Sequence, residues 1–257
     1  MNPHTANIIK IARPGLAILV VCLVLFNLYV VFVPKSYIAT FFFNSDQLYN
    51  IDLAEFFYRQ AIQYDRDEAN RPEPYVHYQL GRIAFLSGNF AWAYRELFKE
   101  LEYYPNNDHT YYTLGLVYGY DKQEEKAIEA FKKFLDYKPG SWAARNDLAW
   151  LQFRIGDIAG AVATIKPAVQ FTEPNPWILN TYGVLLMNQG DLAGAKTALT
   201  QAMALAEEME SSDWGKAYPG NHPAIYDEGL DAMRNSIKAN LSNIEARLVA
   251  VPVDKTR

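Results

Sequence analysis

Hydrophobic residues recur at intervals of three and four through most of the chain, which is the pattern of amphipathic helices. The segment YQLGRIAFLSGNFAWAYRELFKELEYYP, residues 78–105, has a similar copy further along the chain, YTLGLVYGYDKQEEKAIEAFKKFLDYKP, residues 112–139. In the first copy the pattern predicts one helix near residues 74–87 and a second near 90–103, with a short turn between them. Each repeat is therefore expected to be a pair of helices.

The same 34-residue offset continues through four copies and keeps small residues opposite large ones. The small positions of the first helices are Gly81, Gly115, Ala149 and Gly183. Those of the second helices are Ala93, Ala127, Ala161 and Ala195, each followed one helical turn later by Leu97, Phe131, Ile165 and Leu199. The turns carry Gly88, Lys122, Gly156 and Gly190. Small residues let two helices approach closely, so these columns predict the crossing points within each pair.

At these residues the chain resembles the tetratricopeptide repeat family, which has helix-turn-helix units of roughly 34 residues with a Leu-Gly pair, a later Ala and a closing Pro. The resemblance covers residues 74–209, as four units, and departs from the pattern where Ala149 replaces glycine and Glu207 replaces the closing proline. It implies an all-α, right-handed solenoid in which most of the stability comes from interfaces between neighbouring units.

The repeats are flanked by segments of different character. Residues 35–73 are expected to hold a linker and a degenerate lead helix, in which Ala54 and Tyr58 stand as Ala93 and Leu97 do. Residues 210–224 are rich in Gly, Pro and Ser and predict a loop. Residues 225–248 predict an amphipathic helix that caps the solenoid, with a partner-binding helix as the alternative, and residues 249–257 form a tail.

Residues 14–34 form an uncharged, strongly apolar run, long enough as a helix to cross a bilayer. The run predicts a transmembrane helix, with a cleaved signal peptide or a lipoprotein signal ending at Cys22 as alternatives. Lys10 and Arg13 precede it, so residues 1–13 are expected to be a cytoplasmic tail and the repeats to lie outside the cytoplasm, in the periplasm if the source is bacterial. Asn27 is expected to make a polar contact within the membrane.

Amino-acid composition and net charge limit the classes of partner and site that are expected. Half of the chain is apolar and 14% is aromatic, so a packed interior or an aromatic binding surface is expected. The formal net charge of −5 argues against nucleic acid. The single cysteine, Cys22, excludes a disulfide framework and a cysteine-based zinc site.

The family resemblance also implies a binding surface, because first helices of successive units line a concave groove in that family. We call the residues at the inward positions the groove set, and we expect them to bind a polypeptide partner or to pack against the chain's own C-terminal segment. The set is mostly aromatic and neutral. It comprises Tyr75, Tyr78, Arg82, Phe85, His109, Tyr112, Leu116, Asn146, Trp150, Phe153, Trp177, Asn180, Val184 and Met187.

The sequence shows no motif for binding acidic C-termini, metals or phosphates, or for catalysis. Family members that hold acidic C-termini use Lys, Arg and Asn on these helices, whereas this chain has Tyr78, Tyr112 and Leu116 at such places. The histidines His4, His77, His109 and His222 lack metal-ligand spacing, and no Gly-rich phosphate loop is present. We therefore expect no enzyme, no metal, no cofactor and no small-molecule substrate.

Three functions are consistent with these features. The first is a membrane-anchored scaffold that binds membrane-associated proteins through the groove set and helps assemble or stabilise a complex. The second is a structural subunit packed permanently in a large membrane complex. The third is a cytosolic repeat receptor tethered to an organelle.

Overall fold

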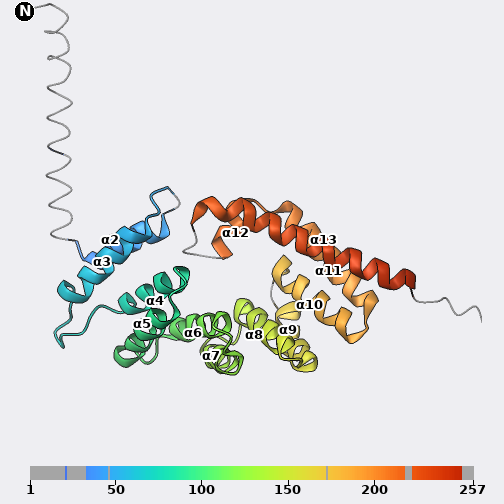
Figure 1. The fold of residues 1–257 in the computed structure, drawn as a ribbon, viewed down its shortest axis with the longest axis horizontal. Coiled ribbons are helices and arrows are strands. Elements are labelled where there is room, and N and C mark those ends of the chain that lie inside the picture. Colours follow the sequence, from blue (N-terminus) through green and yellow to red (C-terminus); the bar gives the residue numbers. More distant parts are fainter. Residues whose placement is uncertain (1–20, 22–32, 46, 172, 218–221, 251–257) are drawn as a thin grey trace, which may run out of the picture. The chain divides into compact units, whose positions relative to one another are not determined.

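The computed structural model describes residues 21, 33–45, 47–171, 173–217 and 222–250. The chain divides into two compact units, Met1–Val76 and His77–Arg257. Over the described residues the regular elements are helices, shown in Figure 1, together with one isolated bridge between Arg66 and Pro72. This confirms an all-α helical repeat fold.

The first unit contains a helical hairpin of α2 (Lys35–Asn44) and α3 (Ile51–Tyr64). The side chain of Asn50 begins α3 by accepting a hydrogen bond from the backbone N–H of Leu53. Ala54 and Tyr58 are buried, and the Tyr58 hydroxyl lies 2.8 Å from the Thr40 hydroxyl on α2. The lead helix predicted from Ala54 and Tyr58 therefore packs against a helix that begins directly after the apolar run.

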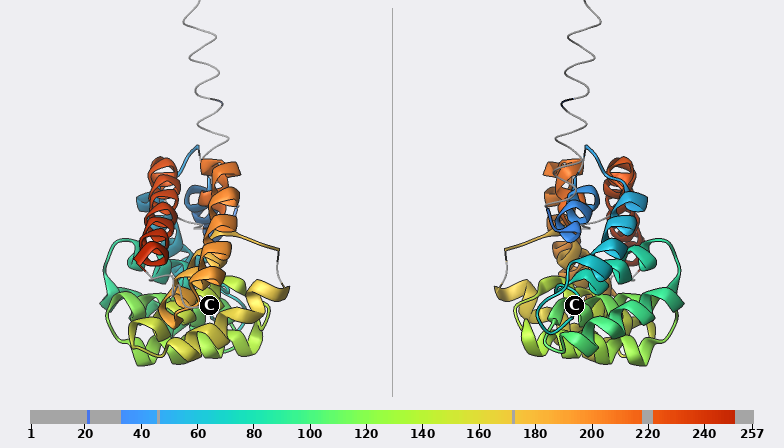
Figure 2. Two further views of the ribbon diagram at one scale, coloured as in Figure 1. Left: turned by 90° about the vertical axis from the view of Figure 1, so that its right-hand side faces the viewer. Right: turned by 90° about the vertical axis from the view of Figure 1, so that its left-hand side faces the viewer.

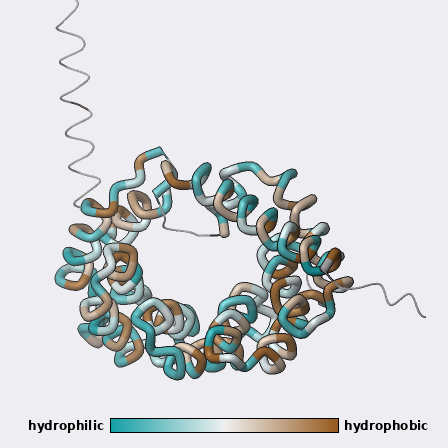
Figure 3. Tube along the Cα trace, turned by 45° about the vertical axis from the view of Figure 1, so that its right-hand side comes forward, coloured by the Kyte–Doolittle hydropathy of each residue, from teal (hydrophilic) through white to brown (hydrophobic). Residues whose placement is uncertain are grey.

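The second unit stacks helix pairs in chain order. The pairs are α4 (Val76–Leu86) with α5 (Phe90–Tyr103), α6 (Asp108–Tyr120) with α7 (Glu124–Tyr137), α8 (Trp142–Arg154) with α9 (Ile158–Phe171), and α10 (Pro176–Gln189) with α11 (Leu192–Glu208). Figure 3 shows hydrophobic and hydrophilic positions alternating along these helices. The two helices predicted for the first repeat are observed, with ends close to the expected ones.

The small columns are where the two helices of each pair meet. A Cβ atom added to Gly81 would lie 2.6 Å from the Leu97 side chain, and one added to Gly115 would lie 2.8 Å from the Phe131 ring. Both distances are far below van der Waals contact. In the third pair Ala149 takes the place of glycine and packs in one buried cluster with Ile165, so the extra methyl group is accommodated there.

Two buried clusters of the repeats join one helix pair to the first helix of the next. One cluster combines Phe131 of α7 with Leu148 of α8, and the following one combines Ile165 of α9 with Ile178 of α10. A single pair would leave such faces exposed to water. Stability of the stack therefore depends on these junctions, as expected for a repeat protein.

The C-terminal region differs from the prediction. Residues 210–224, expected to form a loop, contain the short helix α12 (Ser211–Ala217) and the 3-10 helix η1 (Pro223–Ile225). Trp214 of α12 packs beside Tyr226, with ring centroids 6.0 Å apart. This aromatic contact stabilises a segment whose glycines and prolines had predicted a loop.

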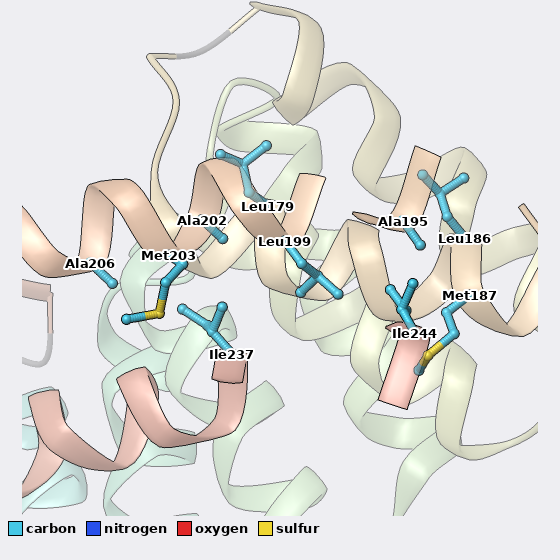
Figure 4. Close-up of a cluster of buried hydrophobic side chains, with 10 residues drawn as sticks. All are labelled: Leu179, Leu186, Met187, Ala195, Leu199, Ala202, Met203, Ala206, Ile237 and Ile244. Carbon is cyan, nitrogen blue, oxygen red and sulfur yellow. The ribbon is translucent and has the colours of Figure 1, made fainter. Parts of the chain in front are cut away.

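Helix α13 (Tyr226–Ala250) runs alongside α11, as Figures 1 and 2 show. Ile237 and Ile244 are fully buried in the cluster that α10 and α11 form. Figure 4 shows Ile237 beside Met203 and Ile244 beside Met187. Helix α13 thus buries the apolar face that a further repeat would otherwise cover.

The four turn positions of the repeats all have left-handed backbone. The φ angles are 71° at Gly88, 59° at Lys122, 85° at Gly156 and 89° at Gly190. Glycine adopts this conformation without strain, whereas a side chain makes it unfavourable. Lys122 is therefore the strained member of the column.

Replacing Lys122 with glycine is expected to raise the free energy of unfolding by roughly 0.5–1 kcal/mol, because the strain at φ 59° is relieved. The matched replacement Lys132→Gly, at an exposed position inside α7, should lower it by about 1 kcal/mol. Urea unfolding with unchanged m-values would measure both. A loss of stability in Lys122→Gly would contradict the strain argument.

The predicted membrane localisation needs correction. Within the described residues, none of the helices combines the length and the apolar composition that a bilayer crossing requires. This finding overturns the single-pass localisation with a cytoplasmic N-terminus and extracytoplasmic repeats. Helix α7, for example, is amphipathic and places Lys132 and Asp136 at exposed positions, which a bilayer interior disfavours. Almost all of residues 14–34, with Asn27 among them, lies outside the described residues.

Candidate functional site

The groove set lies mainly on the first helices of the four pairs, α4, α6, α8 and α10. Tyr75 is the exception, because it precedes α4, with a left-handed φ of 70°. The way in which successive repeats stack determines which members of the set are engaged within the chain and which stay open.

Three members form hydrogen bonds between successive first helices or with α13. The Tyr112 hydroxyl on α6 donates to Oδ2 of Asp147 on α8 over 2.7 Å. Asn146 on α8 accepts from the Thr181 hydroxyl on α10, also over 2.7 Å. Asn180 on α10 accepts from the Asn240 amide on α13 over 2.9 Å. These polar residues hold the repeats in register.

The groove set in the fourth pair is engaged by the chain itself. Val184 and Met187 are buried, and Met187 shares its cluster with Ile244 of α13. The Arg247 guanidinium, also on α13, donates to the Met187 carbonyl oxygen over 3.4 Å. The sequence predicted that either a partner or the chain's own C-terminal segment would pack against the groove set. In the fourth pair, the chain's own helix α13 packs there.

Aromatic contacts bring the first and second pairs together. The Tyr78 ring lies 6.1 Å from the His109 ring, and the Arg82 guanidinium lies 5.8 Å from the Tyr78 centroid, within range of a cation–π contact. The Phe85 ring meets Tyr120 edge to face at 5.3 Å. Two separate ring contacts, Tyr78 with His109 and Phe85 with Tyr120, therefore join α4 to α6.

In the third pair, ring contacts lie along α8 and at its junction with α10. Trp150 and Phe153 pack edge to face at 5.6 Å on α8. Trp177 at the start of α10 lies 5.8 Å from Trp142 at the start of α8. The Trp142–Trp177 contact therefore joins the third pair to the fourth.

A cleft of about 290 Å³ opens between α6 and α8, and we call it the α6–α8 cleft. Helix α6 contributes Gly115, Leu116, Gly119 and Tyr120. Helix α8 contributes Asp147, Trp150, Leu151 and Arg154, and Phe131 of α7 and Lys122 of the turn complete the lining. Leu116 and Trp150 belong to the groove set, so the structure brings these two predicted binding residues to one site.

The other lining residues were missed from the sequence, although one signal was present. Gly119 occupies the same repeat position as Phe85 in the first copy and Phe153 in the third, and Met187 continues that series. A glycine in a column of large apolar residues marks a place where a side chain is absent. The cleft lies at that place.

Two of the charged residues that line the cleft, Arg154 and Asp147, have partners within the chain. Arg154 forms an ion pair with Glu124 at 2.6 Å and donates to the Gly119 carbonyl oxygen at 3.4 Å. Burial raises the pKa of Asp147 to about 6, and hydrogen bonds from Tyr112 and Asn146 lower it only in part. The cleft therefore presents rings and aliphatic side chains beside two partnered charged groups and the exposed Lys122.

Replacing Asp147 with asparagine is expected to remove one component of the pH dependence of stability. An unfolded aspartate has a pKa near 3.9, whereas burial raises the pKa of the folded carboxyl to about 6. Between these values the folded state holds the proton more often, so wild-type stability falls as pH rises from about 4 to about 6 and stays lower above that range. The change is about 3 kcal/mol, at 1.36 kcal/mol for each unit of pKa difference.

Urea unfolding at several pH values between about 4 and 7 would measure this difference. Asp147→Asn keeps an acceptor for the Tyr112 hydroxyl but cannot titrate. The control is Asp136→Asn at an exposed position of α7. Parallel stability curves for wild type and Asp147→Asn would refute the assignment.

Comparisons with known proteins agree with this architecture. A family model described as tetratricopeptide repeat matches residues 108–141, which contain α6 and α7. No curated protein matches the chain. The helix pairs and the matched segment together show a tetratricopeptide-type helical repeat solenoid over the described residues of the second unit.

Several solved structures share the fold. The thermophilic tetratricopeptide protein TTC0263 from Thermus thermophilus is 18% identical, with a TM-score of 0.51, covering 68% of this chain and 91% of its own. A Parabacteroides merdae tetratricopeptide repeat protein is 18% identical, with a TM-score of 0.51 and coverages of 76% and 70%. The MamA RS-1 ArsTM double mutant is 18% identical, with a TM-score of 0.54 and coverages of 63% and 89%. At these identities the likeness concerns the fold alone.

Proposed function

We propose that this chain is a non-enzymatic scaffold that binds a polypeptide partner along the first helices of its repeats and helps assemble a protein complex. The observation that carries the proposal is the open α6–α8 cleft, whose lining includes the rings of Tyr120, Phe131 and Trp150. A concave, largely apolar site with a few polar groups is the usual form of a binding site. Its position on first helices is the one that the family resemblance led us to expect.

The available surface is centred on the second and third pairs. Tyr120 is 69% exposed at the rim of the cleft, and Trp150 is partly exposed within it. In the fourth pair, by contrast, Asn180 and Met187 are engaged by α13. A partner is therefore expected to contact α4, α6 and α8 and to stop before α10.

Site-specific photo-crosslinking would test the proposal. A photoreactive amino acid at position 120 or 150 should capture the same protein in cells, because both positions border the cleft. The control is the same amino acid at position 132, an exposed residue on the second helix α7. Identical products from all three positions, or none from positions 120 and 150, would contradict the proposed binding face.

A second candidate function is that of a permanently packed structural subunit, and the first unit provides its support. Phe41 and Phe56 are each 53% exposed, and rings at 5.2–6.2 Å connect them through Phe42 and Phe57. Exposed apolar patches of this kind mark interaction surfaces. Such a subunit, purified alone, should self-associate, and Phe41→Ser with Phe56→Ser should reduce the association in sedimentation velocity. A monodisperse wild-type chain would argue against this role.

A further inference from the structure

The repeat itself indicates what the α6–α8 cleft lacks. In the column of Gly119, the first pair has Phe85, the third has Phe153 and the fourth has Met187. Phe85 packs with Phe90 at 6.3 Å, and Met187 is buried. Three pairs thus fill this position with a large apolar side chain of their own, while the second pair leaves it empty.

The space is large enough for an aromatic ring. A Cβ atom on Gly119 would meet Leu151 at 3.5 Å, which is ordinary contact, so the absence of a side chain there is not forced by crowding. The cleft volume of about 290 Å³ exceeds that of an engineered apolar cavity of roughly 150 Å³ that holds benzene. A phenyl group therefore fits without displacement of the helices.

The walls favour a neutral aromatic group over a charged one. Tyr120, Phe131 and Trp150 provide ring faces and edges, which pair with another ring in offset or edge-to-face geometry. Two of the three charged lining residues have partners within the chain: Arg154 pairs with Glu124, and Asp147 accepts from Tyr112. The third, Lys122, is an exposed residue of the turn. A charged ligand group would have to compete for Arg154 and Asp147, whereas a ring would not.

We propose that the α6–α8 cleft binds an aromatic side chain of a polypeptide partner, in the place that Phe85 and Phe153 fill in the neighbouring repeats. This inference rests on the proposed scaffold function and names the chemistry that its binding face recognises. Residues of the partner on either side of the ring would lie across the first helices α6 and α8.

The test uses the peptide acetyl-Gly-Phe-Gly-amide as a probe, with acetyl-Gly-Ala-Gly-amide as its control. Binding to the full-length chain is followed by the indole N–H signal of Trp150, assigned through Trp150→Phe. The phenylalanine peptide should shift this signal with a Kd on the order of 1 mM, as expected for a single small group. The alanine peptide should shift it at least tenfold less at equal concentration.

Two variants at position 119 separate occupation of the cleft from other effects. Gly119→Phe restores the residue type of the neighbouring repeats and should weaken binding of the phenylalanine peptide at least tenfold. Gly119→Met, which copies the residue type of Met187, repeats the block if the first variant fails to fold. Lys132→Phe, which adds the same ring at an exposed position of α7 outside the cleft, should bind within about twofold of wild type. Equal binding by wild type and Gly119→Phe, or by the two peptides, would overturn the inference.

Failure here and failure of the scaffold function give different results. A partner crosslinked at position 120 in wild type and equally in Gly119→Phe would leave the scaffold standing and reject the aromatic anchor. Loss of that crosslink in Gly119→Phe and its retention in Lys132→Phe would support both.

Discussion

Phe131→Ala is expected to lower the free energy of unfolding by about 3–5 kcal/mol. Phe131 is 1% exposed and lies where α6, α7 and α8 meet, with its ring against Gly115 and 5.4 Å from the Tyr112 ring. Truncation would open a cavity at the junction of two repeats, which neither pair can close alone. Chemical unfolding of the full chain would give the difference.

The control for this prediction is Phe98→Ala on α5, since Phe98 is 50% exposed and the same atoms are removed. Its cost should be about 1 kcal/mol or less. Gly115→Ala provides a second arm, because its methyl group would lie 2.8 Å from the Phe131 ring and should cost about 1–3 kcal/mol. In the Phe131→Ala background that cost should shrink, and strictly additive effects would contradict the proposed contact.

Ile237→Ala and Ile244→Ala are each expected to lower the free energy of unfolding by about 2–5 kcal/mol. Both side chains are fully buried against α10 and α11 (Figure 4). Because a repeat stack transmits stability mainly between neighbours, the loss should be concentrated at its C-terminal end. Hydrogen exchange should accelerate most in α10, α11 and α13 and least in α4 and α5.

Val249→Ala is the matched control on the same helix, at a position that is 86% exposed, and it should change exchange little. An equal acceleration in α4 and α10 would show that the second unit unfolds as a whole and would contradict the neighbour-by-neighbour account. Unchanged exchange in α10 would show instead that α13 contributes nothing to the last repeat.

The repeat architecture was accessible from the sequence because its signals are local. Gly81 and Leu97 belong to the two helices of one copy, and their meeting follows from the length of those helices and of the turn between them. The turn column was equally local: Gly88, Gly156 and Gly190 carry the left-handed backbone that glycine permits. Lys122 showed that the position, and not the residue type alone, belongs to the repeat.

The binding face could be predicted from the sequence only in part. Tyr112, Asn146 and Asn180 were expected to face a partner, and the structure bonds each of them to a neighbouring helix of this chain. No local sequence pattern distinguishes a tyrosine that is available to a ligand from one that donates a hydrogen bond to Asp147 in the next repeat. The choice depends on how closely successive repeats stack.

What the sequence by itself determined is the helix pair and its period, because helix length, turn backbone and the small-to-large contact all lie within one 34-residue copy. Only the tertiary structure decided that α13 covers Met187 and that an open cleft remains beside Gly119. Both depend on surfaces from different repeats. Burial of apolar area is favourable against any surface that packs well, so three-dimensional shape, and not a local sequence pattern, determines which residues meet there.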